Sequence, residues 1–334
     1  VAVVGAGYWG PNLIRNFSEA PGGDVVAVAD LSADRLVAIR KRFPAVRTVI
    51  DHRLLFADPT IDAVCLATPI STHRPLAEEA FAAGKHVFVE KPLAGTVADA
   101  EAIARAASRA GRTLMVGHTF VYNPAVVAVR ALLVAGELGT VQYIDSQRVN
   151  LGLHQFDSNV LWDLGPHDVS IVLYWLNEEP EWVQCTGGCF IQPGIEDVAF
   201  LTMGFPSGAL AHAHLSWLAP SKLRTMTVIG ARKMAVYDDV QAVEKVKVYD
   251  HGVDSLSPDE LRRSYRAGDI HSPRVPVTEA LQIEVRHFIA CIRTGAVPRS
   301  DGEAGLRVVR ALDAGTRSLR AGGTRVAYRS PAVA

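Results

Sequence analysis

The sequence predicts an α/β Rossmann dinucleotide-binding domain followed by an α+β domain with a large open-faced, mainly antiparallel sheet. Three observations carry this prediction. Short apolar runs alternate with helical stretches over the first third of the chain, as parallel strands joined by crossover helices require. A glycine-rich turn follows the first apolar run. After about residue 120 the alternation stops, and β-rich segments follow one another with helices grouped apart from them.

Length and charge limit the classes of protein to which the chain can belong. Its 334 residues suggest two domains, which we expect at 1–120 and 121–334, with the last helix packing back on the first domain. Lys plus Arg number 34 and Asp plus Glu number 35, so the clustered positive charge of a nucleic-acid-binding protein is not expected. No window has the apolar length of a membrane span, and no basic leader is visible, so we expect a cytoplasmic protein.

The expected strands of the first domain are short runs of apolar, often β-branched residues, which suits a parallel sheet covered on both faces. The stretches between them have helical character, and one ends at Gly84, a typical helix-stop residue. In chain order we expect a strand over 1–4, a helix through 17, a strand over 25–29, a helix over 33–42, a strand over 63–67, a helix over 73–83, a strand over 86–89, a helix over 96–110 and a strand over 114–117.

The second domain shows the two-residue period of half-buried strands. In 209–217, His212 and His214 share one face with other polar residues, while Leu215 and Trp217 share the other. Turn residues at 205–208 indicate a hairpin. We expect strands over 141–149, 182–191, 198–205, 209–217, 223–229 and 245–249, helices over 124–134, 166–176, 279–293 and 303–319, and a long polar loop over 254–276.

A nucleotide-binding motif lies directly after the first strand. Gly5, Gly7 and Gly10 form G-x-G-x-x-G, which opens the first helix. The first glycine permits a tight turn, the second lets the backbone approach a pyrophosphate, and the third allows close packing of helix on strand. The helix N-terminus then offers free N–H groups to phosphates.

An acid at the end of the second strand completes this motif. Asp30 follows Gly10 by 20 residues, the spacing at which a carboxylate accepts hydrogen bonds from the adenosine ribose hydroxyls. Its charge repels a 2′-phosphate, so NAD is favoured over NADP. Ser32 and Arg35 lie close enough to form a phosphate pocket instead, which keeps NADP as the alternative.

Three further motifs accompany the glycine loop. They are Ala67-Thr-Pro69 with His73, Glu90-Lys-Pro92 after a strand, and Asp163-Leu-Gly-Pro-His167 about 70 residues later. With these motifs the chain resembles the Gfo/Idh/MocA oxidoreductases, the family of glucose–fructose oxidoreductase and the inositol dehydrogenases. The resemblance begins at the glycine loop and continues through the pattern of the second domain.

The resemblance implies that Lys91 and His167 act at a sugar hydroxyl that is oxidised while hydride leaves for the nicotinamide. An imidazole titrates near neutral pH, so His167 suits the role of base. As an ammonium, Lys91 would stabilise developing alkoxide charge. Asp163 lies one helical turn before His167 if both are helical, and would bind substrate or orient the imidazole. Glu90 and Pro92 would fix the lysine.

The resemblance also implies further contacts. Expected cofactor-binding residues are Gly5, Gly7, Tyr8, Trp9, Gly10, Asp30, Thr68, Pro69, His73, Glu90, Lys91 and Trp162. Expected substrate-binding residues are His118, Tyr122, Arg148, Asn150, Asp163 and His167. The chain departs from the commoner family pattern near Tyr122, where an arginine often stands, so the resemblance does not define the contacts to substrate hydroxyls at this position. No metal is expected, because His212 and His214 lack a third ligand in the sequence.

The resemblance implies an NAD-dependent dehydrogenase of a ring secondary hydroxyl, with C3 as the expected position, of a nucleotide-sugar or an aminoglycoside or other glycoside. Such an enzyme supplies a ketone for aminosugar or antibiotic biosynthesis. A 3-ketosugar reductase, a cyclitol dehydrogenase of the inositol type, an NAD-assisted elimination or hydrolysis and a non-catalytic sugar or NAD sensor remain alternatives. The resemblance implies a homodimer or homotetramer formed through the second-domain sheet.

Overall fold

The computed structural model describes residues 1–152, 158–254 and 264–329 of the chain. By its contacts the chain forms two compact units, one of residues 1–122 and 278–309 and the other of residues 123–277 and 310–334. The predicted domains, 1–120 and 121–334, stay a prediction. Helix α9 (Gly302–Arg320) begins in the first unit and ends in the second.

The first unit contains a parallel sheet of six strands in the order β3-β2-β1-β4-β5-β6. This is the strand order of a Rossmann fold, in which the order reverses between β1 and β4. The strands are β1 (Ala2–Val4), β2 (Ala27–Ala29), β3 (Arg47–Val49), β4 (Ala63–Leu66), β5 (His86–Glu90) and β6 (Leu114–Gly117). The helices are α1 (Gly10–Glu19), α2 (Ala33–Arg42), α3 (Arg53–Phe56), η1 (Ile70–Thr72), α4 (His73–Ala82), α5 (Val97–Ala110), η2 (Thr119–Tyr122) and α8 (Ala280–Thr294).

Helix α8 returns from late in the chain to complete the core of the first unit. Its Phe288 packs edge-on against Phe17 of α1 and Phe88 of β5, with ring centroids 6.1 and 5.7 Å apart. At its start Glu279 accepts hydrogen bonds from Arg15 at 2.7 and 3.0 Å. Because β4 is buried along its whole length and β5 from Val87 to Glu90, these apolar runs of the sequence are strands covered on both faces.

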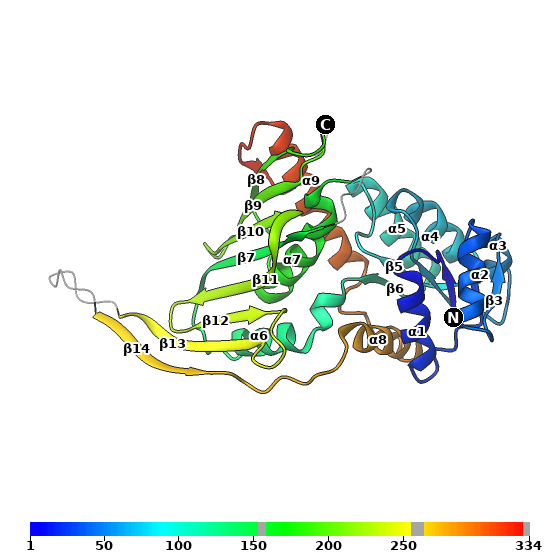
Figure 1. The fold of residues 1–334 in the computed structure, drawn as a ribbon, viewed down its shortest axis with the longest axis horizontal. Coiled ribbons are helices and arrows are strands. Elements are labelled where there is room, and N and C mark those ends of the chain that lie inside the picture. Colours follow the sequence, from blue (N-terminus) through cyan, green and yellow to red (C-terminus); the bar gives the residue numbers. More distant parts are fainter. Residues whose placement is uncertain (153–157, 255–263, 330–334) are drawn as a thin grey trace. The chain divides into compact units, whose positions relative to one another are not determined.

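The second unit contains a sheet in the order β14-β13-β12-β11-β7-β10-β9-β8-β15. Its pairs are antiparallel apart from β7 with β10, so the predicted fold class is confirmed. The strands are β7 (Val141–Leu151), β8 (Trp182–Gly188), β9 (Val198–Gly204), β10 (Leu210–Ser216), β11 (Leu218–Gly230), β12 (Met234–Asp238), β13 (Val246–Asp254), β14 (Ser264–His271) and β15 (Val326–Ala327). Figure 1 shows α6 (Pro124–Val134) and α7 (Val160–Leu176) against one face of this sheet.

The two faces of this sheet differ as the sequence period predicts. On β10, Ala211, Ala213 and Leu215 are buried on the face that α7 covers. His212 and His214 lie on the other face, where His214 stacks on Phe200 with ring centroids 4.7 Å apart. Within the part of this unit that the structure describes, the second face is open at Phe200, which is 40 % exposed.

Several predicted elements differ from those of the structure. The expected helix over 166–176 begins earlier, at Val160, because Asn159 caps it and Pro166 is accommodated inside it. The expected loop over 254–276 contains β14, an edge strand whose polar and apolar residues do not alternate by face; residues 255–263 of this prediction lie outside the described chain. The short elements β3, α3, β12 and β15 were not predicted, and β8 ends at Gly188 rather than at 191.

Among the residues that the structure describes, no helix combines the length and the apolar character that crossing a membrane needs.

A buried serine gives a test of how α9 holds the edge of the second sheet. The Ser318 hydroxyl is 0 % exposed, donates to the Thr324 carbonyl at 2.6 Å and accepts from the Cys185 amide at 2.8 Å. We expect Ser318→Ala to lower the free energy of unfolding by about 1–3 kcal/mol, because both backbone groups lose a buried partner. Denaturant unfolding measures this, with the exposed Ser108→Ala as control; equal values for the two variants would contradict the assignment.

Candidate active site

The glycine loop between β1 and α1 has the close contacts that only glycine permits. Gly5 has φ +98°, and a Cβ there would lie 2.3 Å from the Ala67 carbonyl oxygen. A Cβ on Gly10 would lie 2.4 Å from the Gly5 oxygen. Gly7 differs, because the atom nearest to a Cβ there is Arg35 Nη1 at 4.0 Å. Two glycines therefore hold the loop together, and the third faces open space.

This open space lies at the N-terminus of α1, where an anion is stabilised by the helix dipole. Trp9 precedes the helix and makes no side-chain cap, and Pro11 occupies its first turn. Tyr8 and Trp9 are 84 % and 41 % exposed, so their rings are available to a ligand on the loop. The loop thus fits the pyrophosphate of a dinucleotide.

Asp30 lies just after β2 and braces the loop. Its Oδ2 accepts from the Ala6 amide at 2.7 Å, and its Oδ1 accepts from the Ser32 amide at 2.8 Å. The Arg35 guanidinium lies 3.7 Å from Oδ2. Each carboxylate oxygen has two lone pairs, so both retain capacity for ribose hydroxyls. The same arrangement puts the cation of Arg35 beside Asp30 and within 4.0 Å of a Cβ built on Gly7.

His73, at the start of α4, joins the loops that follow β4 and β5. Its ring is 1 % exposed; Nε2 lies 2.9 Å from the Thr68 carbonyl oxygen, and Nδ1 lies 3.1 and 3.3 Å from those of Pro92 and Leu93. Burial lowers the pKa of His73. The ring therefore lies between the Thr68 carbonyl on one side and the segment after β5 on the other, and the exposed Pro69 directly follows Thr68.

The Glu90-Lys91-Pro92 segment leaves the carboxyl end of β5. The Lys91–Pro92 peptide bond is cis. The Lys91 amide donates to Glu90 Oε2 at 3.2 Å, and the Glu90 carboxyl lies flat on Gly117, where a Cβ would be 3.2 Å from its three carboxyl atoms. Burial raises the pKa of Glu90 to about 7, while the positive charge of Lys91 acts in the opposite sense.

In the second unit, α7 carries Asp163 and His167 one helical turn apart, so the two lie on the same side of the helix. Asn159 caps the helix by accepting from the Trp162 amide at 3.2 Å. Trp217 Nε1 donates to Asp163 Oδ2 at 3.0 Å and fixes this carboxylate. The half-buried imidazole of His167 thus lies one helical turn from the Asp163 carboxylate, which Trp217 holds in place.

A buried ion pair anchors α7 to the sheet immediately beyond His167. The Asp168 carboxylate accepts hydrogen bonds from Arg148 Nε at 2.8 Å and Nη2 at 3.1 Å, and from the Ser146 hydroxyl at 3.1 Å. Both charged side chains are almost fully buried, at 3 % and 1 % exposure. Paired and hydrogen-bonded in this way, the two charges fix the rotation of α7 about its axis.

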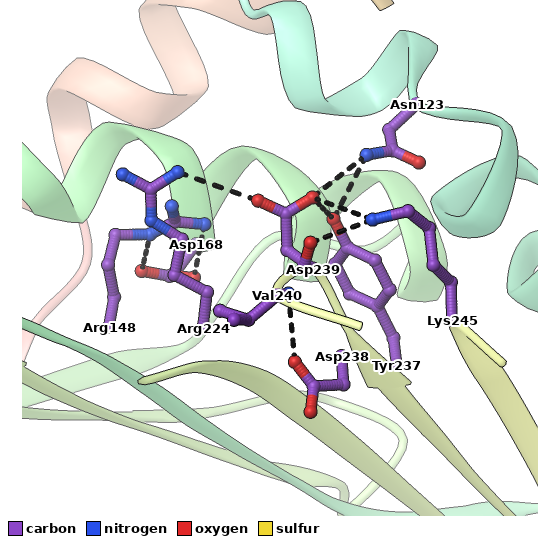
Figure 2. Close-up of polar contacts among 9 residues, drawn as sticks. All are labelled: Asn123, Arg148, Asp168, Arg224, Tyr237, Asp238, Asp239, Val240 and Lys245. Carbon is purple, nitrogen blue, oxygen red and sulfur yellow. Dashed lines mark hydrogen bonds and ion pairs between the residues drawn. The ribbon is translucent and has the colours of Figure 1, made fainter. Parts of the chain in front are cut away.

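Figure 2 shows that this pair adjoins a second polar group centred on Asp239. Its carboxylate accepts from the Tyr237 hydroxyl at 3.0 Å and from Asn123 Nδ2 at 3.3 Å. Arg224 Nη1 lies 3.5 Å from the other oxygen, and Lys245 Nζ donates to the Asp239 carbonyl at 2.7 Å. The helix-covered face of the sheet is thus polar at β7, β11 and β12.

The remaining expected residues fall into the two units as follows. His118 and Tyr122 belong to the first unit and are 2 % and 1 % exposed, with the Tyr122 hydroxyl 3.1 Å from Ser300 Oγ. Asn150 lies half-buried on β7 in the second unit. The Trp162 indole, also there, donates to Thr316 Oγ1 at 2.9 Å.

The structure thus brings the expected nucleotide residues other than Trp162 together with Lys91 in the first unit, and Asp163, His167, Arg148 and Trp162 together in the second. Sequence reasoning missed Asp168, the partner that holds Arg148. For Asp168 a signal was present, since it directly follows His167 in the sequence. In the described residues no group of three or more metal-ligating side chains is found.

Comparison with known proteins identifies the family. Residues 1–118 match the model of the oxidoreductase family with an NAD-binding Rossmann fold, and residues 126–236 match the GFO/IDH/MocA C-terminal domain. The chain belongs to the Gfo/Idh/MocA family. It is therefore an NAD-dependent oxidoreductase, and the open space at Gly7 beside the braced Asp30 is consistent with that cofactor.

Individual relatives cover almost the whole chain. D-apiose dehydrogenase of Paraburkholderia graminis is 27 % identical over 97 % of this chain and 88 % of its own length. A crystal structure of a putative oxidoreductase from Magnetospirillum magnetotacticum is 32 % identical, with TM-score 0.80, over 94 % of this chain and 98 % of that one. UDP-N-acetylglucosamine 3-dehydrogenase from Acidithiobacillus ferrooxidans is 25 % identical, with TM-score 0.81, over 96 % and 97 %.

Two glycine variants separate a structural contact from a cofactor contact. Gly10→Ala puts a Cβ 2.4 Å from a backbone oxygen, so we expect it to lower the melting temperature. In Gly7→Ala the nearest atom to the new Cβ is Arg35 Nη1 at 4.0 Å, which is ordinary van der Waals contact, so the melting temperature should stay the same while NAD affinity falls about tenfold or more. Thermal unfolding without NAD and calorimetric NAD binding measure the two effects. Unchanged NAD affinity in Gly7→Ala would exclude the loop as the pyrophosphate site.

Proposed function

We propose that the protein is an NAD-dependent sugar dehydrogenase that oxidises a ring secondary hydroxyl, at C3, of a nucleotide-sugar or an aminoglycoside or other glycoside. The observation that carries the proposal is the pairing of Asp163 and His167 on one side of α7, in a chain that also places Lys91 at the carboxyl end of a strand in an NAD-binding sheet. A sensor has no need of such acid, base and ammonium groups.

The proposed chemistry uses three side chains of this chain. His167 accepts the hydroxyl proton, and Asp163, held by Trp217, binds the substrate or orients the imidazole. The Lys91 ammonium stabilises the negative charge that develops on the substrate oxygen. Bound NAD supplies a nicotinamide that accepts the hydride.

The proposed binding residues follow the same division. Gly5, Gly7, Tyr8, Trp9, Gly10, Asp30, Thr68, Pro69, His73, Glu90, Lys91 and Trp162 are proposed to hold the cofactor. His118, Tyr122, Arg148 and Asn150, with Asp163 and His167, are proposed to form the sugar site. Arg148 and Asn150 are two residues apart on β7, and the bidentate bond of Arg148 to Asp168 gives it a fixed direction.

Among the relatives, one acts on C3 of a UDP-sugar and another on D-apiose, by their names. These names support a sugar substrate, and the first supports the C3 position. The test is a panel of UDP- and TDP-sugars, aminoglycosides and inositols, scored by NADH absorbance, with matching 3-ketosugars and NADH in the reverse direction. NADH formed in equal amount to ketone supports the proposal. Absence of an NADH signal across the whole panel would favour a sensor.

The proposed base gives a specific kinetic prediction. We expect His167→Asn to lower kcat by about 10²–10⁴-fold, because proton transfer from the hydroxyl loses its acceptor. NAD affinity should stay within about twofold of the unmodified protein, since the imidazole acts on the substrate. Steady-state kinetics and calorimetry measure the two values. Equal losses in turnover and in NAD affinity would refute the base role.

The acid after β2 gives a prediction of cofactor preference. Asp30→Ala removes the charge that repels a 2′-phosphate. It also removes the carboxylate that lies 3.7 Å from the Arg35 guanidinium, so Arg35 loses this anionic neighbour. We expect the ratio of kcat/KM for NAD to that for NADP to fall about tenfold or more. The unmodified protein should prefer NAD, and a tighter affinity for NADP would overturn this assignment.

We further propose a cytoplasmic homodimer or homotetramer that assembles through the open face of the second-unit sheet. Phe200 is 40 % exposed on this face and stacks on His214, so apolar surface is available to a second copy. We expect Phe200→Asp to lower the mass measured by light scattering, because a charge would be buried in the interface. An unchanged mass would place the interface elsewhere.

A further inference from the structure

An arginine on the helix-covered face of the second sheet is only partly satisfied by protein groups. Nη1 of Arg224, on β11, lies 3.5 Å from Asp239 Oδ2, which is a long contact for a charged pair (Figure 2). The Arg224 Nε is buried and has no hydrogen-bond partner among the residues that the structure describes. A guanidinium has five N–H donors, and donors left without acceptors cost free energy. Arg224 therefore lies where a further acceptor would stabilise it.

A second arginine lies directly opposite Arg224 in the sheet. Arg148 of β7 and Arg224 of β11 are register partners in an antiparallel pair, so their Cβ atoms lie about 4.5–5.5 Å apart on the same face. Like charges in this arrangement repel each other. Asp168 neutralises Arg148 alone, because both of its oxygens accept from that guanidinium, at 2.8 and 3.1 Å. The positive charge of Arg224 therefore needs a separate partner.

Asp239 is such a partner only in part, because other groups share its carboxylate. Its Oδ1 accepts from the Tyr237 hydroxyl at 3.0 Å and from Asn123 Nδ2 at 3.3 Å. The Lys245 ammonium lies 3.9 Å from the same oxygen and donates to the Asp239 carbonyl at 2.7 Å. One carboxylate thus faces two cations, Arg224 and Lys245, while its other neighbours are a phenol and an amide. Positive charge exceeds negative charge in this group.

The two cations remain accessible to a ligand. The side chains of Arg224 and Lys245 are 31 % and 27 % exposed. The ammonium of Lys245 has three N–H donors, so its bond to the Asp239 carbonyl leaves capacity for an anion. The other carboxylate drawn in Figure 2, that of Asp238, accepts from the Val240 amide at 2.9 Å. An anion that entered here would meet two partly exposed cations.

The position of these cations relates them to the proposed sugar site. Arg148 holds Asp168, which directly follows His167 on α7. Asn150 lies two residues from Arg148 along β7, and therefore on the same face of the strand. Arg224 is the register partner of Arg148 on the adjacent strand. The excess positive charge thus lies beside residues that are proposed to bind the sugar.

We propose that Arg224, together with Lys245, binds an anionic group of the substrate, a carboxylate or a phosphate attached to the sugar. That the ligand is a substrate rests on the proposed function. Carboxylates and phosphates present paired oxygens that match the fork of a guanidinium, and a nearby ammonium adds to the attraction. A nucleotide-sugar carries a diphosphate and a uronic acid carries a carboxylate, so both suit the site. A cationic aminoglycoside is repelled by it.

Inorganic phosphate tests the anion site without turnover. Calorimetry at constant ionic strength measures its binding to the NAD-saturated protein, in which phosphate does not compete for the cofactor site. We expect Arg224→Gln to weaken phosphate binding about tenfold or more, and Arg224→Lys to weaken it less, because lysine keeps the charge but loses the fork. Arg320→Gln removes an exposed arginine of the same unit and should leave the affinity unchanged. Equal affinities in Arg224→Gln and the unmodified protein, or no binding to the latter, would overturn the proposal.

Lys245→Gln gives a second measurement that does not depend on the folding of an Arg224 variant. It removes the other cation and leaves both arginines in place, so phosphate binding should weaken about threefold or more. The melting temperature without phosphate shows that each variant is folded. An unchanged phosphate affinity in Lys245→Gln would contradict the part of the proposal that includes Lys245.

Three probes distinguish a carboxylate from a phosphate as the bound group. Methyl glucoside is neutral, methyl glucuronide adds a carboxylate to the ring, and UDP-glucose adds a diphosphate. We expect one of the two anionic probes to bind the NAD-saturated protein about tenfold more tightly than methyl glucoside, and this probe identifies the group. Arg224→Gln should remove the difference and Arg320→Gln should keep it. Equal binding of all three probes to the unmodified protein would refute a substrate anion at this site.

Kinetics with an anionic substrate from the panel separate binding from chemistry. Arg224→Gln should raise KM about tenfold and leave kcat within about twofold, because the contact holds the ground state and the transition state alike. An unchanged KM in this variant would overturn the substrate assignment. Absence of turnover with every compound of the panel in the unmodified protein would instead count against the proposed function, since phosphate binding is measured without it.

Discussion

The contact between the glycine loop and the end of β4 is the constraint on which the nucleotide-binding unit depends. At Gly5 the backbone lies against the Ala67 carbonyl so closely that no Cβ fits, and Gly10 lies as closely on Gly5. These contacts set where α1 begins and hence where its N-terminus points. They also bring the loop next to the segment that His73 braces. Cofactor site and lysine segment are therefore parts of one backbone framework.

Buried charge in this protein is held in small, locally balanced groups, which accords with a net charge of −1. Arg148 and Asp168 neutralise each other on the covered face of the second sheet. In the first unit Glu90 has the neighbouring Lys91, and the backbone N–H groups at the start of α1 serve an anion in place of side-chain cations. Breaking one partner of such a group leaves a buried charge, which is why these residues act as pairs.

The sequence was sufficient for features that depend on local steric or periodic rules. Gly5, Gly10 and Asp30 are predictable because a turn, a close packing and a ribose contact each demand one residue type at one spacing. The start of α7 was misplaced because Pro166 resembles a first-turn proline, whereas the cap of Asn159 decides the boundary. Edge strands such as β14 are not predicted from the sequence, because neither of their faces requires apolar residues at every second position.

Long-range partners escaped prediction for a different reason. The pairing of Arg148 with Asp168 depends on β7 and α7 packing together, and Glu284 bonds Thr119 of η2 only because α8, with a residue 165 positions further along the chain, returns to the first unit. Asp168 is marked only by its place next to His167, and nothing in the sequence around Glu284 reveals its partner. The residues proposed to do chemistry are therefore easier to find from the sequence than the residues that hold the surrounding elements in place.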